Sequence, residues 1–215
     1  TKNKLSAKQW EKIIRTAHLV GLPTTATIMY GHVDKPMHWA AHLDFLRSIQ
    51  KETGGFTELV PLSFVHTDSP LYRQSPTTVR PGPTLDEVMK MHAIARIMLN
   101  GWIPNIQVSW TKLGAETALK MLMYGVNDLG GTLMNESISR AAGAKHGQEI
   151  TATEMVQIIR RAGKIPVRRN TTYETLEEYH NHNPKSIAPM VFRNGKDPLK
   201  FLNKNRNKTM ARSFQ

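Results

Sequence analysis

The feature that most limits what this chain can fold into is a repeated alternation of amphipathic helical segments with short, apolar, β-prone segments. A unit of this alternation takes roughly 30 residues, as in a (β/α) barrel in which about 250 residues form eight units. Strands that alternate with helices are typical of βαβ units and a parallel sheet. The β-prone segments are expected at residues 24–30, 57–64, 105–110 and 128–132.

Capping signals set the expected helix boundaries. Three capping boxes, in which a hydroxyl side chain is followed three residues later by Gln or Glu, predict helix starts at Ser6, Thr84 and Thr151. Another helix is expected to begin with Asp34 as its N-cap and Pro36 in its first turn. The expected helices lie at about residues 6–20, 34–52, 84–99, 115–123 and 151–163.

Four strands with helices between them amount to half of an eight-unit barrel, so the predicted fold class is α/β with about four βα units. A small open α/β sandwich is the alternative. The period is lost after Gly163, and residues 1–180 are therefore expected to form one unit and residues 181–215 an extension. Because the chain opens directly on a helix start at Ser6, we interpret it as a fragment.

The formal net charge of +12 is unevenly distributed over the 215 residues. From residue 185 onward, eight basic residues stand against the single acidic residue Asp197. We interpret this segment as a solvated basic tail, with an RNA-binding arm as the weaker alternative. No apolar run is long enough to span a membrane. We therefore expect a soluble protein with no nucleic-acid or membrane partner, cytoplasmic or in an organelle, since the sequence does not decide the compartment.

The chain contains no cysteine, which excludes disulfides and thiolate-held metal sites within these residues. His38 and His42 are spaced to share one helix face, but they lack the acidic residue of an HExxH motif. No phosphate-binding glycine loop or nucleophile elbow is present. The sequence predicts no metal ligand and assigns no catalytic residue.

Polar and aromatic residues gather just past the expected strand ends, where parallel barrels build their sites. Such a set predicts a pocket of mixed donors and acceptors with aromatic walls, suited to a polar heteroaromatic substrate. The alternatives are loop histidines bonded to the backbone, a core tryptophan and solvated charges. The residues are Tyr30, Gly31 and His32; Phe64, His66 and Asp68; Gln107, Ser109, Trp110 and Lys112; and Asn127, Asp128, Thr132, Asn135 and Glu136.

Several strings of residues resemble the radical S-adenosylmethionine family that includes FO synthase, and in particular its CofH-type members or the CofH-like C-terminal half of the fused form. The resemblance runs from about Leu5 to Tyr173. The strings FVH at 64–66 and SPLY at 69–72 favour these members over the related menaquinone-pathway enzymes. The other strings are TATIMYGHV at 25–33, QKETGGFTE at 50–58, VPL at 60–62, NDLGGTLM at 127–134 and ESISR at 136–140.

The resemblance implies a radical-type TIM barrel, of which this chain would be the C-terminal half with its trailing helix. It implies a [4Fe-4S] cluster and S-adenosyl-L-methionine, which together oxidise L-tyrosine and join its 4-hydroxybenzyl unit to 5-amino-6-(D-ribitylamino)uracil in deazaflavin biosynthesis. A CofG-type activity, fused or separate, would complete the product. The family's C-x-x-x-C-x-x-C loop has no counterpart here, so the cluster ligands are expected upstream and this chain alone is expected to be inactive.

The resemblance also implies roles for individual residues. S-adenosylmethionine would lie against Met29, Tyr30, Gly31, Val60, Pro61 and Leu62. The substrates would be bound by His32, His66, Gln107, Ser109, Trp110, Lys112, Asp128, Thr132 and Glu136. A different reading is that the chain is a natural cysteine-free relative, without a cluster, that acts as a binding or scaffold partner of a complete radical enzyme.

Overall fold

A small parallel sheet forms the centre of the fold. The computed structural model describes residues 4–133, 136–147, 149–180 and 210–213. Its first sheet has the order β1-β2-β3, with β1 at Thr24–Tyr30, β2 at Phe56–Ser63 and β3 at Asn105–Ile106. Both pairings are parallel, as the alternation predicted. An isolated parallel bridge between Gln107 and Asp128 continues the sheet beyond β3.

Three capping boxes begin helices where the sequence predicted them. They start α1 at Ala7–Leu19, α4 at Leu85–Leu99 and α8 at Ala152–Arg161. In each box the hydroxyl accepts from the backbone N–H three residues later, and the Gln or Glu side chain reaches back to the cap. Within the described residues, no helix is both long enough and apolar enough to cross a membrane.

The predicted cap of the second helix was wrong. Helix α2, at Pro36–Thr53, has Lys35 as its N-cap, and its C-cap is Gly54 with φ of 65°. Asp34 cannot cap it, because its carboxylate accepts from the backbone N–H groups of Gly31 and His32 instead. The side chain that resembled a helix cap holds the preceding loop.

The third and fourth predicted strands are shorter than expected. The chain leaves β3 after Ile106, and Trp110, predicted as strand, begins the short helix α5 at Trp110–Leu113. Helix α6 follows at Ala115–Met121. The fourth strand is reduced to the bridge at Asp128, because Gly130 has φ of 72°, which an extended strand does not allow. A barrel closed on itself is not formed by the described residues.

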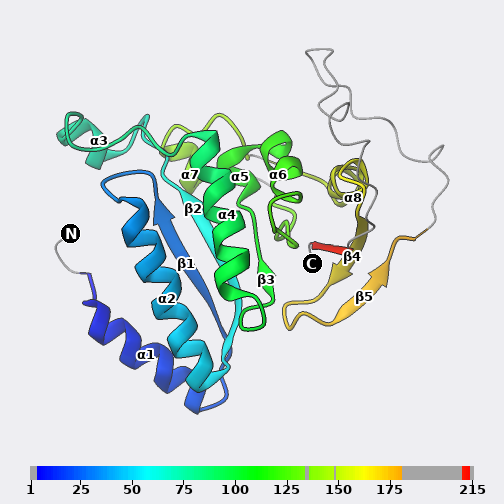
Figure 1. Cartoon of the computed structure of the whole chain (residues 1–215). Helices are drawn as coiled ribbons and strands as arrows, with labels where there is room; N and C mark the ends of the chain where they lie inside the picture. The colour runs from blue at the N-terminus through cyan, green and yellow to red at the C-terminus, as the bar shows by residue number, and fades with distance from the viewer. Residues whose placement is uncertain (1–3, 134–135, 148, 181–209, 214–215) are drawn as a thin grey trace.

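Two short helices lie in the long connections. Helix α3, at Pro70–Gln74, lies in the loop between β2 and α4, and α7, at Ile138–Ala141, lies in the polar segment after the bridge. Figure 1 shows α2 and α4 side by side across the parallel sheet, which agrees with the contacts between them.

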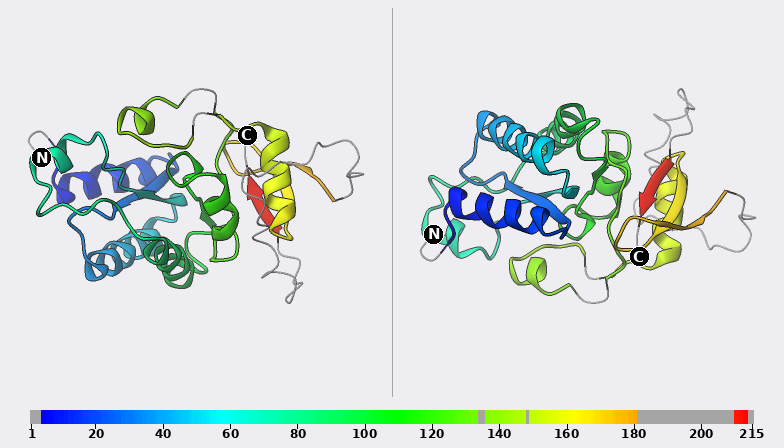
Figure 2. Two further views of the ribbon diagram at one scale, coloured as in Figure 1. Left: turned by 90° about the horizontal axis from the view of Figure 1, so that it is seen from above. Right: turned by 90° about the horizontal axis from the view of Figure 1, so that it is seen from below.

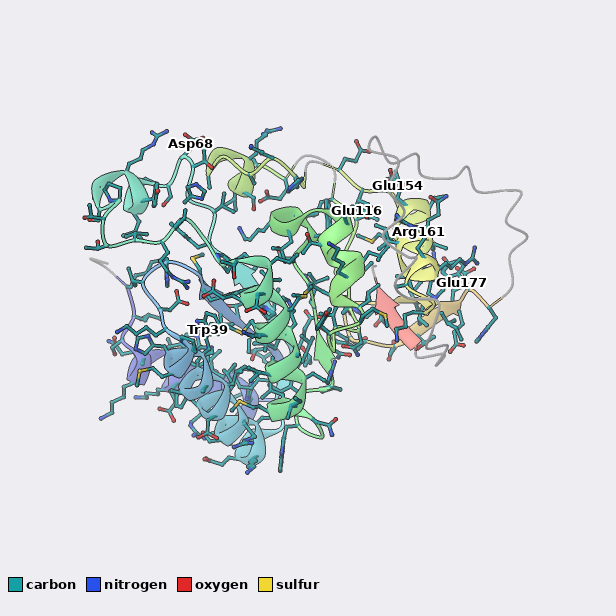
Figure 3. All side chains as sticks on the ribbon, turned by 45° about the horizontal axis from the view of Figure 1, so that its top comes forward. Trp39, Asp68, Glu116, Glu154, Arg161 and Glu177 are labelled. Atoms are coloured by element: carbon teal, nitrogen blue, oxygen red, sulfur yellow. The ribbon has the colours of Figure 1, made fainter. Side chains whose placement is uncertain are left out.

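A second sheet was missed in the sequence. Its order is β5-β4-β6, with β4 at Ile165–Arg169, β5 at Thr175–Glu178 and β6 at Met210–Ser213. Strands β4 and β5 are antiparallel, and β6 runs parallel to β4. Figure 2 shows α8 and this sheet at the opposite end of the molecule from α1. Helix α8 packs against α6, where Arg161 pairs with Glu116 at 3.3 Å (Figure 3). The proposed boundary at residue 180 stays a prediction, because residues 181–209 lie outside the described residues.

Alternate residues of β1 and β2 face opposite sides of the sheet. Ala26, Ile28 and Tyr30 are buried, whereas Thr25, Thr27 and Met29 are exposed. The buried set packs with side chains of α2 such as Leu43 and Leu46, both fully buried. This apolar layer contributes most to holding the helices on the sheet, since apolar burial is the dominant favourable term in folding.

We expect Leu46→Ala to lower the free energy of unfolding by about 2–5 kcal/mol, because it leaves a cavity in this layer. The matched control is Leu19→Ala at the end of α1, where the leucine side chain is 82% exposed, and we expect a change of less than about 0.5 kcal/mol. Urea unfolding of the two variants measures the difference. Equal losses would show that Leu46 does not belong to the stabilising core.

Candidate functional site

The register of β1 and β2 defines one face of the sheet on which a ligand can lie. Thr25 is paired with Glu58, Thr27 with Val60 and Met29 with Leu62. Paired residues of a parallel sheet point to the same side. We call this side, made by those six residues, the site face. The opposite side is the one that α2 and α4 cover.

Five of the six residues implied for S-adenosylmethionine divide between the two sides, and Gly31 lies in the loop after β1. Met29, Val60 and Leu62 lie on the site face, and Met29 is half exposed. Tyr30 and Pro61 are buried on the covered side. The Tyr30 ring packs edge-on against Trp39 at 5.5 Å between centroids, and its hydroxyl accepts from Ser63 Oγ at 3.2 Å. Burial raises the pKa of Tyr30 well above its usual value, so this phenol is a neutral core group.

The loop after β1 is held by one carboxylate. Asp34 Oδ1 accepts from the backbone N–H of Gly31 at 2.9 Å, from the N–H of His32 at 2.8 Å and from His32 Nδ1 at 2.5 Å. Trp39 Nε1 also donates to Asp34. Burial alone would raise the pKa of Asp34, but the hydrogen bonds from Gly31, Trp39 and His32 outweigh it and hold the pKa well below its usual value.

The ionised Asp34 fixes one ring nitrogen of His32. A carboxylate only accepts hydrogen bonds, so His32 Nδ1 carries a proton and donates it to Asp34. Gly31 has φ of 91°, and a Cβ there would meet Pro83 at 2.3 Å, so the turn needs glycine. The backbone N–H of Arg80 donates to the His32 carbonyl at 2.8 Å. His32 is therefore a half-buried histidine of fixed orientation at the strand end.

A cavity of about 330 Å³ lies beyond the ends of β1 and β2. Met29, Phe64, Lys112 and Ile138 are among the residues that line it. Its rim joins two distant segments, because the backbone N–H of Asp68 donates to the Ala142 carbonyl at 3.0 Å. Figure 3 shows Asp68 in the loop beside α7. The cavity brings together a residue of the first predicted strand with residues that the sequence placed after the second and third strands.

Other predicted substrate residues lie near this end of the sheet in different surroundings. His66 is half-buried against Tyr72, with 4.9 Å between ring centroids. Ser109 is buried, with its Oγ 3.1 Å from Thr111 Oγ1. Trp110 is 5% exposed and donates from Nε1 to the Gly131 carbonyl at 3.3 Å, so it is a wall of the core.

The segment after the bridge contains the remaining predictions. Thr132 is exposed. The Glu136 carboxylate accepts from the backbone N–H groups of Ile138 and Ser139, at 3.1 and 2.8 Å, and so holds the start of α7. Lys112 Nζ donates to Ser139 Oγ at 3.0 Å. Asn135 lies outside the described residues.

A buried ionic cluster closes the other end of the site face. Arg169 Nε donates to Asp128 Oδ2 at 2.5 Å, and Arg169 Nη2 lies 3.8 Å from Glu58 Oε1. Asp128 is fully buried, Glu58 is 3% exposed, and the Arg169 guanidinium stacks on the Tyr173 ring at 4.2 Å. Glu58 Oε1 itself has no hydrogen-bond partner among the described residues.

The turn between β4 and β5 presents Arg169 and Tyr173 to the sheet. Asn170 Oδ1 accepts from the backbone N–H groups of Thr172 and Glu174, and Tyr173 takes a left-handed φ of 67°. A cavity of about 410 Å³ between this turn and the sheet is lined by Glu58, Gln107 and Arg169, among others. Of the residues in this region, the sequence analysis singled out Gln107 and Asp128 and missed Glu58, Arg169 and Tyr173.

The cluster was missed for an identifiable reason. Asp128 precedes Arg169 by 41 residues, and no local pattern reports a contact over that separation. The only available signal was the position of Glu58 in an apolar strand, where a charged residue needs a partner. Neither this cluster nor any other group of His, Asp and Glu within the described ranges is arranged to hold a metal ion.

Comparison with known proteins gives consistent matches. The family model described as the CofH/MqnC C-terminal region matches residues 53–182. The 5-amino-6-(D-ribitylamino)uracil–L-tyrosine 4-hydroxyphenyl transferase of Methanopyrus kandleri is 52% identical over 177 residues, which are 82% of this chain and 47% of that protein. The FO synthase of Mycobacterium leprae is 54% identical over 173 residues, 80% of this chain and 20% of that protein. The chain thus spans about half the length of the archaeal relative and a fifth of the mycobacterial one.

The pH dependence of stability tests the buried cluster. Burial, followed by the charge of Asp128, raises the pKa of Glu58 from 4.5 to about 7, although Arg169 opposes the shift. Because the folded state keeps this proton to a higher pH than the unfolded chain, Glu58 favours folding below pH 4.5, and that contribution is lost as the pH rises through about 7.

We therefore expect Glu58→Gln to become more stable relative to the parent chain as the pH rises over this interval. Urea unfolding of both proteins at a series of pH values measures it. The control is Glu149→Gln, at an exposed position. If the Glu58→Gln and parent stabilities stay parallel at every pH, the shifted titration is refuted.

Proposed function

The chain belongs to the CofH/MqnC C-terminal family, and on that premise we propose that it forms part of a transferase that joins the 4-hydroxybenzyl unit of L-tyrosine to 5-amino-6-(D-ribitylamino)uracil. The relatives carry names for this reaction or for FO synthase. The observation that carries the proposal is the convergence of polar and apolar side chains from three βα units on one cavity beyond the ends of β1 and β2. The product would serve deazaflavin biosynthesis.

We propose that the fold is the C-terminal half of a (β/α) barrel. The parallel strands follow one another in the sheet in chain order, and the Gln107–Asp128 bridge marks the position of a fourth strand. Strand β1 is an edge of this sheet, and an edge strand offers unpaired backbone groups to a further strand. The relatives are at least about twice as long as the matched segment. Their additional length supports the proposal of further βα units beside β1.

The cofactors implied by the family differ in how they fit these residues. A [4Fe-4S] cluster takes thiolate ligands, and this chain contains no cysteine, so its own residues do not hold the cluster. S-adenosyl-L-methionine fits better, because Met29, Val60 and Leu62 offer it an apolar strip on the site face. When bound, it supplies the radical chemistry of the reaction.

The chain's own residues would position the substrates and exclude water. The His32 ring is held by Asp34 at Nδ1, and Nε2 is the ring nitrogen left to form a hydrogen bond with a bound molecule. The ring of Phe64 lies 5.6 Å from the His32 ring and forms an apolar wall beside it. Gln107 lines the second cavity, between the β4–β5 turn and the sheet, and its amide adds both donor and acceptor atoms. A substrate rich in N–H and O–H groups needs such partners, because unpaired buried polar groups are costly.

A second activity is proposed as a partner. This chain covers a fifth of the mycobacterial FO synthases and about half of the archaeal transferases. We propose that a CofG-type activity, fused in one arrangement and separate in the other, completes the deazaflavin.

A chimera tests the proposal. The matched segment of the Methanopyrus kandleri transferase is replaced by this chain, to which it is 52% identical, and the protein is reconstituted with iron and sulfide without oxygen. With L-tyrosine, 5-amino-6-(D-ribitylamino)uracil, S-adenosylmethionine and a reductant, we expect a coupled product that carries the 4-hydroxybenzyl unit. Mass spectrometry detects it.

The 215-residue chain alone is the control, and we expect it to give no product because it has no thiolate ligands. A chimera that holds its cluster and cleaves S-adenosylmethionine without forming the coupled product would refute the transferase assignment. The scaffold reading predicts a different result, in which the free chain binds the complete archaeal enzyme and changes its rate.

A further inference from the structure

Lys112 is the cation of the cavity beyond the ends of β1 and β2. Its ammonium group is half-buried and donates to the Ser139 hydroxyl at 3.0 Å. Among the described residues that line this cavity, the other charged side chain is Asp68, which is paired with Arg73. No carboxylate of the described residues forms an ion pair with Lys112.

We propose that Lys112 binds the α-carboxylate of an amino-acid ligand in this cavity. The inference rests on the proposed function, which supplies two ligands with such a group, L-tyrosine and the methionine moiety of S-adenosylmethionine. The shared chemistry is an α-amino acid whose carboxylate takes the place beside Lys112 that no acidic side chain of the described residues fills.

The burial of Lys112 is the first step of the argument. Taking an ammonium group out of water is costly unless an opposite charge or several acceptors replace the water. Ser139 provides one neutral acceptor, and its own side chain is buried, with 2% of the residue exposed. A carboxylate from a ligand would restore the missing charge and accept a charge-assisted hydrogen bond.

The nearest acidic groups are engaged elsewhere. Glu136 is close enough to favour the charged form of Lys112, but its oxygens accept from the backbone N–H groups of Ile138 and Ser139. Burial is the larger effect, and it lowers the pKa of Lys112. Lys112 is thus a partly desolvated cation to which the described part of the chain gives no carboxylate partner.

The rest of the cavity suits the apolar part of such an amino acid, the ring of tyrosine or the methylene groups of the methionine moiety. Met29, Phe64 and Ile138 line it together with Lys112, and the cavity volume is about 330 Å³. Ligand pockets combine such apolar walls with a few placed polar groups that fix orientation. Met29 also belongs to the site face, so a ligand held at Lys112 reaches the end of β1.

The position of Lys112 is set by two segments. It lies on α5, between the buried Trp110 and the glycine turn at Gly114, which has φ of 79°. Its partner Ser139 lies on α7, 27 residues away in sequence. The lysine and the segment that covers it therefore depend on each other, and an anion at Lys112 would stabilise both.

Binding to the 215-residue chain tests the proposal directly. Lysines are reductively methylated with ¹³C, and the Lys112 signal is identified by its loss in Lys112→Arg. We expect this signal to move on addition of L-tyrosine or S-adenosylmethionine and to stay in place with tyramine, which lacks the carboxylate. The exposed Lys120 on α6 is the internal control.

The separate additions of L-tyrosine and S-adenosylmethionine identify which of them supplies the carboxylate. A shift with tyrosine alone assigns Lys112 to the substrate, and a shift with S-adenosylmethionine alone assigns it to the cofactor. No shift with either compound, or an equal shift with tyramine, overturns the proposal.

Kinetics in the chimera give an independent measurement. We expect Lys112→Met to raise the KM for the ligand it binds by roughly tenfold or more, with a smaller change in kcat, because a charge-assisted hydrogen bond is lost. Lys112→Arg should recover part of the loss, and Lys120→Met should have no effect. An unchanged KM in Lys112→Met overturns this inference, whereas a parent chimera that forms no product counts against the transferase itself.

Discussion

The parallel pairing of β1 with β2 decides which side chains the candidate site can use. Side chains alternate along a strand, so the register that places Met29 beside Leu62 also places Tyr30 beside Ser63 on the other side. A shift of one residue would exchange the two sets and bury the exposed one. The large apolar layer under α2 and α4 resists such a shift, so core packing and site geometry are set by one constraint.

The buried ionic cluster ties the end of the chain's described core to the same sheet. Two carboxylates, Glu58 and Asp128, face one guanidinium, Arg169, where little water reaches them. Removing the guanidinium would leave uncompensated buried charge, which is far more costly than replacing the whole cluster by apolar groups. The β4–β5 turn is therefore part of the structure that supports the site face, although it follows the last predicted helix.

Local signals predicted the framework well, because they depend on neighbouring residues. The capping boxes at Ser6, Thr84 and Thr151 begin helices as predicted, and β1 has the predicted bounds. The family resemblance was confirmed by the matched family model.

Features that depend on distant contacts were not predicted. Only the tertiary fold defines the pairing of β4 with β5 and the partners of Asp128. It also decides that Pro61 faces the side of the sheet that the helices cover. The prediction of Asp34 as a helix cap was wrong for a related reason. An aspartate before a helix can accept from the N–H groups of that helix or from those of the preceding loop, and the sequence does not distinguish the two. The roles given to individual site residues stay predictions.

Two contacts near the cavity, that of Asp34 with the loop after β1 and that of Lys112 with Ser139, join residues at very different separations in the sequence. Asp34 holds the β1 loop through partners within five residues, so the loop keeps its shape at little cost in chain entropy. Lys112 meets Ser139 across 27 residues, and the segment between them must be ordered before the contact forms. The loop of His32, which packs against the cavity-lining Phe64, is therefore preorganised by local bonds, whereas the lysine side of the cavity depends on the tertiary fold. A ligand held by Lys112 would stabilise the lysine side, because it adds contacts where local bonds do not hold the chain.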